Sequence, residues 1–337
     1  MNFNFIKKSF IFKQLKFFVI VLFILIIFIE IIFQTMFFTG NSLIKKPILF
    51  FNPYCDQEYW DNNKQSDFNN DRYKYHSILT LIKKNHDIST EEINNVIRKK
   101  KNDYPIFYGS SFIDHEHFIK SFNDVKNYAV KSYGLDQIYL SYMLTKHQYY
   151  GDVIIFGFLL EDLDRIIFKK RNFNKIRYKK INNELLLENY PIDLKDNNKK
   201  TITFYSYNFF KSLIFLFKNN FDYKKSNCEI DFKKDLFKYF IKQINQQVEL
   251  NNQKLIVVTF NFMEDIGSNE NWRYEFIKNF LKEQNVLHLD SKKLIELNMI
   301  DNNYTAIRYY SKKDLHLSEF GNEVIFKELT KLIELYK

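Results

Sequence analysis

Short apolar runs alternate with longer amphipathic segments from residue 104 onward. The runs have the length of single β-strands and most are rich in Ile, Val, Phe or Tyr: Pro105–Tyr108, Val125–Val130, Val153–Phe158, Leu255–Phe260 and Val286–Leu289. The amphipathic segments have helical spacing: Leu135–Lys146, Leu236–Gln247, Trp272–Lys282 and Gly321–Leu335. This alternation is typical of a parallel sheet covered by helices on both faces. We therefore predict an α/β domain over residues 104–337, with ligands at the carboxyl ends of its strands.

One stretch, at about 168–235, does not fit this alternation. It contains the apolar segment Glu184–Pro191 and a Phe-rich segment, Phe209–Phe217. We interpret the stretch as an insertion between the third and fourth strands. The Phe-rich segment is too short and too interrupted to span a bilayer, so we predict a buried or lid helix there.

The N-terminal part of the chain contains one long apolar segment, Phe17–Phe38, with Glu30 as its single charge. At about 1.5 Å per residue, a helix of this length crosses a hydrocarbon core of ~30 Å. The preceding residues 1–16 contain four lysines and no acid. The positive-inside rule then places residues 1–16 in the cytoplasm and the rest of the chain outside it.

A cleaved signal peptide is the competing interpretation of this segment. Its apolar region would be ~7–15 residues long and would end in small residues. Residues 37–42 read Phe-Phe-Thr-Gly-Asn-Ser and make a poor cleavage site, so an uncleaved anchor is favoured. Glu30 either marks a helix partner or reaches toward the membrane interface, and both readings stay open.

Residues 39–103 are interpreted as a stalk and lead-in segment. They contain Pro47, Pro53 and an Asn- and Asp-rich stretch. A capped amphipathic helix is expected to begin at Ser89.

Composition indicates a folded domain, with 46% hydrophobic and 27% charged residues among 337. The net charge of +10 does not indicate nucleic-acid binding, because basic residues are interleaved with acidic ones and no binding module is recognisable. Two cysteines, Cys55 and Cys228, do not form a C-x-x-C pair. They either form a disulfide in an exported domain or are unrelated thiols.

Two short motifs have residues suited to nucleophilic catalysis. Tyr108-Gly109-Ser110-Ser111-Phe112 directly follows the first predicted strand, where a tight turn would expose a serine hydroxyl. Asp314-Leu315-His316 precedes the last predicted helix. A serine needs a base to take its proton, and a carboxylate fixes the tautomer of a histidine base. In a parallel sheet both motifs fall at the same edge.

At this point the chain resembles the SGNH/GDSL hydrolases. Four segments match the blocks of that family in order: Gly109-Ser110-Ser111-Phe112, Asn127–Gln137, Asp152–Asp162, and Asp314-Leu315-His316 with Gly321. The resemblance covers residues 104–337. It implies a flavodoxin-like three-layer fold, with Ser111 as nucleophile, His316 as general base and Asp314 orienting His316. It implies chemistry on an acyl ester without a metal or an organic cofactor.

The oxyanion site departs from the family pattern. The family's second-block glycine, whose backbone N–H stabilises the oxyanion together with that of the nucleophile, corresponds to Ser132. The usual asparagine donor of the third block corresponds to Glu161, and an ionised carboxylate accepts hydrogen bonds but does not donate them. Four explanations stay open: Glu161 points away, it is protonated, the register is shifted, or the site is degenerate.

Further candidates surround these residues. Gly109, Ser110, Asp162 and Arg165 are predicted to line the pocket, although Asp162, Asp164 and Arg165 would equally suit ion pairs. The cluster Asp114-His115-Glu116-His117 is expected to be a polar helix start rather than a metal site, since His115 and His117 would lie on different faces of a helix.

The resemblance favours an esterase or an O-acyltransferase outside the cytoplasm, acting on an acyl ester such as that of an envelope polysaccharide. A non-catalytic SGNH-like binding or scaffolding module in an envelope complex is the alternative. A nucleotide-binding flavodoxin-like protein is disfavoured, because neither a G-x-G-x-x-G nor a P-loop pattern is present.

Overall fold

The structure is a computed structural model of the whole chain. It describes residues 3–39, 52, 54–59, 72–86, 88, 100–101, 105–115, 118, 125–150, 153–171, 173–182, 184–192, 204–219, 228–268, 272–312 and 315–335.

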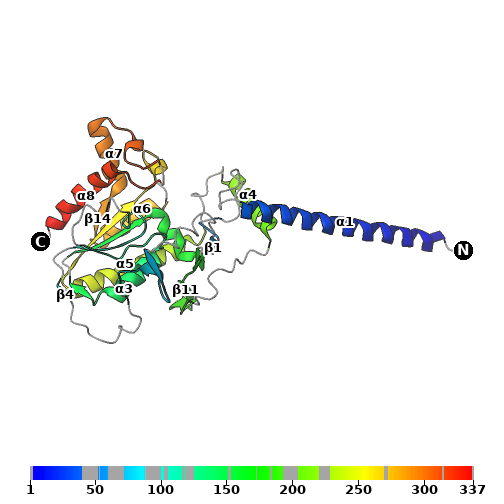
Figure 1. Ribbon diagram of the computed structural model, residues 1–337, viewed down its shortest axis with the longest axis horizontal. Helices are drawn as coiled ribbons and strands as arrows, with labels where there is room; N and C mark the ends of the chain where they lie inside the picture. The colour runs from blue at the N-terminus through cyan, green and yellow to red at the C-terminus, as the bar shows by residue number, and fades with distance from the viewer. Residues whose placement is uncertain are drawn as a thin grey trace.

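A five-stranded parallel sheet forms the centre of the domain (Figure 1). Its spatial order is β14 (Leu287–Asp290), β13 (Lys254–Phe260), β8 (Val153–Leu159), β5 (Ile106–Gly109) and β6 (Lys126–Asn127). Each strand lies on one of the five predicted apolar runs. Numbered along the chain, the order from the β6 edge is 2-1-3-4-5, which is the flavodoxin-like arrangement. The predicted α/β fold is thereby confirmed.

Helices cover both faces of this sheet, because the side chains of each strand alternate between two apolar clusters. Ile154 and Phe156 of β8 point to one cluster, while Val153 and Ile155 point to the other. The first cluster includes the buried sides of α3 (Leu135–Thr145), α5 (Ile230–Leu250) and α6 (Trp272–Glu283). The second includes those of α7 (Ser291–Asn302) and α8 (Glu319–Glu334), which lie above the sheet in Figure 1.

A β-hairpin from the predicted stalk belongs to the domain. Strands β2 (Tyr73–His76) and β3 (Thr80–Lys83) pair antiparallel. Leu79, Leu81 and Ile82 are buried in the cluster beside α3, so this part of the 39–103 segment is core and not stalk. The helix expected from Ser89 lies outside the described residues.

The predicted insertion follows β8 through a 3₁₀ helix, η3 (Leu160–Ile167). Its described residues include short strands and a helix: β9 (Lys170–Arg171), β10 (Phe173–Asn174), β11 (Arg177–Ile181), β12 (Glu184–Glu188) and α4 (Tyr205–Lys218). Strand β9 also pairs with β1 (Glu58–Tyr59). Outside the insertion, β4 (Lys100–Lys101) and β7 (Tyr149–Tyr150) form a separate short parallel pair. Two further 3₁₀ turns are η5 (Met263–Asp265) and η6 (Ala306–Arg308).

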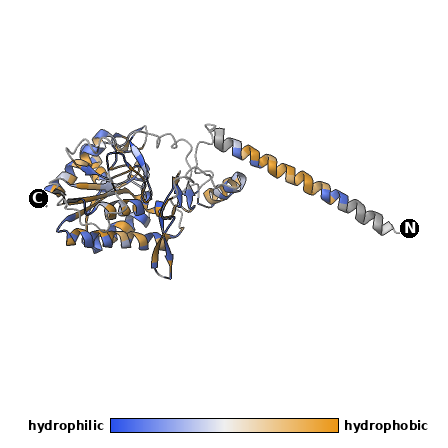
Figure 2. Cartoon of the chain, turned by 60° about the horizontal axis from the view of Figure 1, so that its bottom comes forward, coloured by the Kyte–Doolittle hydropathy of each residue, from blue (hydrophilic) through white to orange (hydrophobic). Residues whose placement is uncertain are grey.

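The long helix α1 (Phe3–Thr39) projects from the domain (Figures 1 and 2), and most of its apolar side chains between Leu15 and Ile32 are exposed. Within it, the segment Lys13–Thr35 contains an 18-residue window with a mean hydropathy of 3.1, and it is long and apolar enough to cross a membrane. Helix α4 lies beside the domain-proximal end of α1 (Figure 1). The helix predicted at Phe209–Phe217 is present as part of α4, but it is not a buried helix, since Phe210, Ile214 and Phe217 are exposed. The alternative of a lid helix stays a prediction.

The two cysteines form a disulfide, Cys55–Cys228, with a Cα–Cα distance of 5.2 Å. The bond joins residues that are 173 positions apart and ties the segment before β1 to the start of α5. Of the two readings of these cysteines, the paired one applies.

Candidate active site

The candidate nucleophile follows an unusually close pair of strands. Gly109 at the end of β5 pairs in register with Gly157 of β8. A Cβ atom on Gly109 would lie 2.4 Å from the carbonyl oxygen of Gly157 and 2.8 Å from Cγ1 of Ile113. Only glycine fits at this position. The N–H of Ser110 then donates to the Gly157 carbonyl at 3.2 Å, and the half-buried Ser111 begins the turn at the carboxyl edge of the sheet.

The candidate base lies against this turn, although it is more than 200 residues later in the sequence. Its loop is held by a β-bridge between Tyr310 and Leu317 and by a 2.7 Å hydrogen bond from the Ser311 N–H to the His316 carbonyl. The His316 ring is 4.8 Å from the ring of Phe112, the residue directly after Ser111. The structure therefore brings the two candidate motifs together. Asp314 lies outside the described residues, and its role stays a prediction.

His115 is a neighbour of the base that the sequence analysis did not place in the site. Its ring stacks on that of His316, with centroids 5.3 Å apart and planes inclined by 21°. Because residues 111–115 form turns and bends and not a helix, His115 folds back toward the C-terminal loop. Glu116 and His117 lie outside the described residues. Among the residues that are described, no group of three metal-ligating side chains is found.

Ser132 has the backbone conformation that a glycine would have at the oxyanion position. Its φ angle is +70°, in the left-handed region that residues with a Cβ rarely adopt. Within the described part of the chain, the N–H groups of Ser111 and Ser132 donate no hydrogen bond. Both donors are therefore available to a ligand. The predicted match of Ser132 to a glycine is consistent with this conformation.

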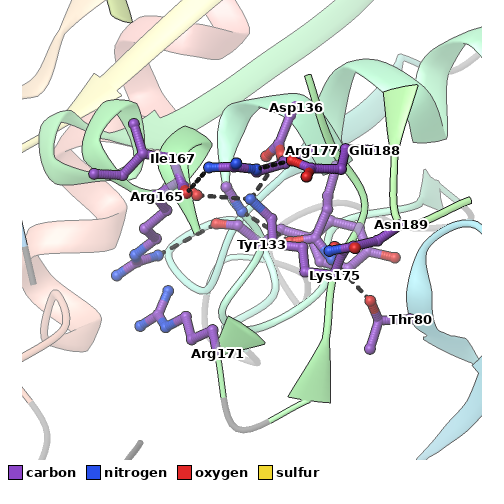
Figure 3. Close-up of polar contacts among 12 residues, drawn as sticks. Thr80, Tyr133, Asp136, Arg165, Ile167, Arg171, Lys175, Arg177, Glu188 and Asn189 are labelled. Atoms are coloured by element: carbon purple, nitrogen blue, oxygen red, sulfur yellow. Dashed lines mark hydrogen bonds and ion pairs between the residues drawn. The ribbon is translucent and has the colours of Figure 1, made fainter. Parts of the chain in front are cut away.

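Two arginines that follow β8 hold the Ser132 turn in place. Arg171 of β9 donates to the carbonyl of Ser132 at 3.1 Å. Arg165 of η3 donates to the carbonyl of Tyr133 at 3.3 Å (Figure 3). Lys175 links α3 to η3 (Figure 3). Its ammonium group pairs with the Asp136 carboxylate at 2.7 Å and donates to the Arg165 carbonyl at 2.6 Å.

Asp162 links the nucleophile turn to the third block. Its side chain is fully buried and pairs with Arg165, and it also accepts a hydrogen bond from the Leu159 N–H at 2.9 Å. Burial raises the pKa of the Asp162 carboxyl, while Arg165 and the hydroxyl of Ser110 oppose the rise. Ser110 is likewise fully buried. Both side chains are thus part of the buried layer next to the candidate nucleophile, and their predicted place in the lining of a pocket stays a prediction.

Glu161 is buried beside a compact charge cluster. Asp164 pairs there with Lys233 at 2.8 Å and with Arg273 at 2.5 Å. Burial alone would lower the pKa of Arg273, but the charge and hydrogen bonds of Asp164, with a smaller contribution from Glu161, raise it. Burial raises the pKa of Tyr54, and the charge of Glu161 adds to this rise. The carboxylate of Glu161 is therefore within electrostatic reach of the positive Arg273.

Comparisons with known proteins give structural likenesses only. No protein-family model and no curated protein sequence matches the chain. It is similar to a solved structure of a protein from Desulfitobacterium hafniense DCB-2 that is assigned to the G-D-S-L lipolytic family, with 14% identity, a TM-score of 0.37 and coverage of 68% of this chain and 99% of that one. It is also similar to an acetyl xylan esterase, with 14% identity, a TM-score of 0.39 and coverage of 69% of this chain and 100% of that one.

A GDSL-like lipase from Bacteroides thetaiotaomicron VPI-5482 is also similar, with 11% identity, a TM-score of 0.35 and coverage of 70% of this chain and 88% of that one. Because these TM-scores are below 0.5, neither the fold nor the activity is inferred from these likenesses.

Proposed function

We propose that this chain is a membrane-anchored serine ester hydrolase or O-acyltransferase of SGNH type. The observation that carries the proposal is the contact of the His316 loop with the Ser111 turn, at the carboxyl edge of a flavodoxin-like sheet. Acyl transfer requires a serine nucleophile, a base within reach of its hydroxyl and N–H donors for the oxyanion, and the proposal assigns these roles to the residues that meet at this edge.

In the proposed reaction, the Ser111 hydroxyl attacks the ester carbonyl while His316 accepts its proton. The N–H groups of Ser111 and Ser132 stabilise the negative charge that develops on the carbonyl oxygen. His316 then gives the proton to the leaving alcohol, and an acyl-serine remains. Water releases the acyl group in a hydrolase, and a sugar hydroxyl of an envelope glycan accepts it in a transferase. Asp314 is assigned the role of orienting His316.

We assign α1 as an uncleaved anchor with residues 1–16 in the cytoplasm, 17–38 in the membrane and the domain outside. The lysines before the apolar segment support this orientation. The Cys55–Cys228 disulfide supports it independently, because such bonds persist mainly in oxidising compartments.

Labelling with a fluorophosphonate, which reacts with activated serines, tests the proposal on the full chain in detergent. We expect the parent and the exposed-serine control Ser268→Ala to label, Ser111→Ala to be unlabelled and His316→Ala to label much more slowly. Thermal unfolding of each variant verifies that it is folded. A folded parent that does not label, or labelling that persists in Ser111→Ala, contradicts the proposed chemistry.

The buried Glu161 favours a second candidate, a non-catalytic binding module that retains the SGNH-type fold. A carboxylate in place of an amide donor would oppose an oxyanion at this position. The same experiment separates the two candidates, since a binding module has no reason to keep an activated serine.

A further inference from the structure

Helix α4 has two apolar faces, one packed and one open. Tyr205 and Leu216 are buried on the packed face, together with Ser212. The open face consists of four large exposed side chains: Tyr207 (69% exposed), Phe210 (49%), Ile214 (57%) and Phe217 (61%). Their spacing of three, four and three residues places them in one stripe along the helix. A continuous stripe of this kind indicates a partner surface.

The N-terminus of α4 is fixed to the long apolar helix by Glu30. One carboxylate oxygen of Glu30 accepts the N–H of Tyr205 at 2.6 Å. The other accepts the N–H of Ser206 at 3.1 Å and its hydroxyl at 2.5 Å. Glu30 therefore satisfies N–H groups that the first turn of a helix leaves without partners. Its negative charge also suits the positive end of the helix dipole.

Aromatic packing extends this contact by one turn of α1. The ring of Phe33 lies 4.6 Å from that of Phe209 and 5.7 Å from that of Phe210. Phe210 also belongs to the exposed stripe of α4, so this stripe contacts α1 through the ring of Phe33. Glu30 therefore has a helix partner, as one of its two readings expected.

The position of this contact along α1 sets the depth of α4. From Phe17 to Phe33 the helix rises about 24 Å, at 1.5 Å per residue, within a hydrocarbon core of about 30 Å. With Phe17 at the inner boundary, Phe33 lies about 6 Å inside the outer boundary, which is the depth at which interfacial helices insert. Aromatic side chains such as Tyr207 and Phe210 are enriched at this level of a bilayer.

We propose that α4 is an interfacial helix whose open stripe inserts into the outer leaflet of the membrane that α1 crosses. The inference rests on the proposed anchoring of α1. An amphipathic helix in this position binds through its buried apolar area. Lys218 lies beside the stripe on the helix surface, where it faces the headgroups, while Lys211 pairs with Asp56 at 2.5 Å and ties α4 to the domain. The domain is then held to the bilayer at two places, α1 and α4.

Depth-dependent quenching tests this on the full chain in vesicles of phosphatidylcholine with a minor share of phosphatidylglycerol. Single cysteines at Tyr207 or Ile214 are labelled with an environment-sensitive NBD dye, while Cys55 and Cys228 stay oxidised. The matched control is Ile300→Cys on α7, because Ile300 is an apolar side chain that is 77% exposed. Phe28→Cys reports on the depth of α1. Lipids carry a nitroxide near the headgroup or near the end of the acyl chain.

We expect Tyr207→Cys and Ile214→Cys to lose most of their fluorescence to the headgroup-proximal nitroxide, and Ile300→Cys to lose none. Phe28→Cys should be quenched by the deep nitroxide. Quenching at Phe28 without quenching on α4 would overturn the interfacial helix and leave the anchor intact. Absence of quenching at Phe28 would overturn the anchor, and the inference with it. Fluorophosphonate labelling is scored separately, so a failure of the proposed chemistry is distinguishable from either result.

Discussion

Gly109 and Gly157 stand opposite each other in neighbouring parallel strands, and the side chain of Ile113 covers them both. Ile113 is fully buried and lies two residues after Ser111. The position of Ser111 thus depends on the close packing of the β5 and β8 backbones at Gly109 and Gly157 against the side chain of Ile113.

Replacing Gly157 by alanine should therefore destabilise the domain by about 1–3 kcal/mol, the usual effect of overpacking. The new Cβ would lie 2.4 Å from Cγ1 of Ile113 and 2.5 Å from its Cδ1. Urea unfolding in detergent, followed by tryptophan fluorescence, measures the change. In an Ile113→Ala background the same replacement should have a much smaller effect. An equal effect in both backgrounds would show that the two residues do not compete for space.

Ser132→Gly should stabilise the domain by up to about 1 kcal/mol, because a left-handed residue with a Cβ is unfavourable by roughly that amount. The φ angle of +70° is open to glycine without strain. Fluorophosphonate labelling should be retained, since the N–H group of residue 132 is unchanged. Ser132→Val, which keeps a branched Cβ in the same conformation, should lower stability instead. Equal stability of the glycine variant and the parent would argue against strain at this residue.

Glu161→Asn should raise the rate of ester hydrolysis by about 10²-fold, because one oxyanion donor is worth on the order of 10²–10³ in rate. An amide would donate where an ionised carboxylate repels the developing charge. Initial rates with an activated aryl ester measure the effect. Asp231→Asn, an exposed position on α5, serves as the charge-matched control. A fall in the rate below that of the parent would mean that Glu161 itself takes part in the reaction.

His86 should make the domain lose stability in mild acid. Burial, with the positive charges of Lys83, Lys126 and Lys74, lowers the pKa of His86 from 6.5 to about 3. Between these values the unfolded chain binds a proton that the folded chain does not, so the free energy of unfolding falls as pH falls through this window.

His86→Gln should reduce that pH dependence by up to about 1.4 kcal/mol per pH unit. Urea unfolding at several pH values between 4 and 6, about the middle of the window, measures the slope. The exposed His147→Gln should leave the slope unchanged. Identical slopes for the parent and His86→Gln would mean that this histidine is protonated in the folded state.

The strands could be predicted because the central ones are buried on both faces and form continuous apolar runs, and most helices could be predicted because their burial is periodic. All five sheet strands lie on apolar runs, and α3, α6 and α8 begin and end close to their predicted bounds. Helix α7 was missed, since only Ser291, Lys292 and Ile295 are buried along it and its apolar pattern is weak. Its start is instead determined by Asp290, whose carboxylate accepts the N–H groups of Lys292 and Lys293.

The candidate site was only partly open to prediction. Ser111 and His316 belong to short local motifs, so their residue types were visible in the sequence. The stacking of His115 on His316 and the bond from Arg171 to Ser132 depend on tertiary contacts between distant segments. A sequence pattern contains no signal for such contacts. The cysteines could be counted, but their pairing required the fold.

The candidate nucleophile and base lie at opposite ends of the folded domain's sequence, and they meet only through the loop that precedes α8. During synthesis and export, the segment with Ser111 emerges long before the segment with His316. For most of that time the chain has a serine without its base. Under the proposed function, ester chemistry can begin only after α8 has packed onto the sheet, when the domain is already outside the cytoplasm. The separation of Ser111 and His316 along the sequence thus delays ester chemistry until the domain has been exported.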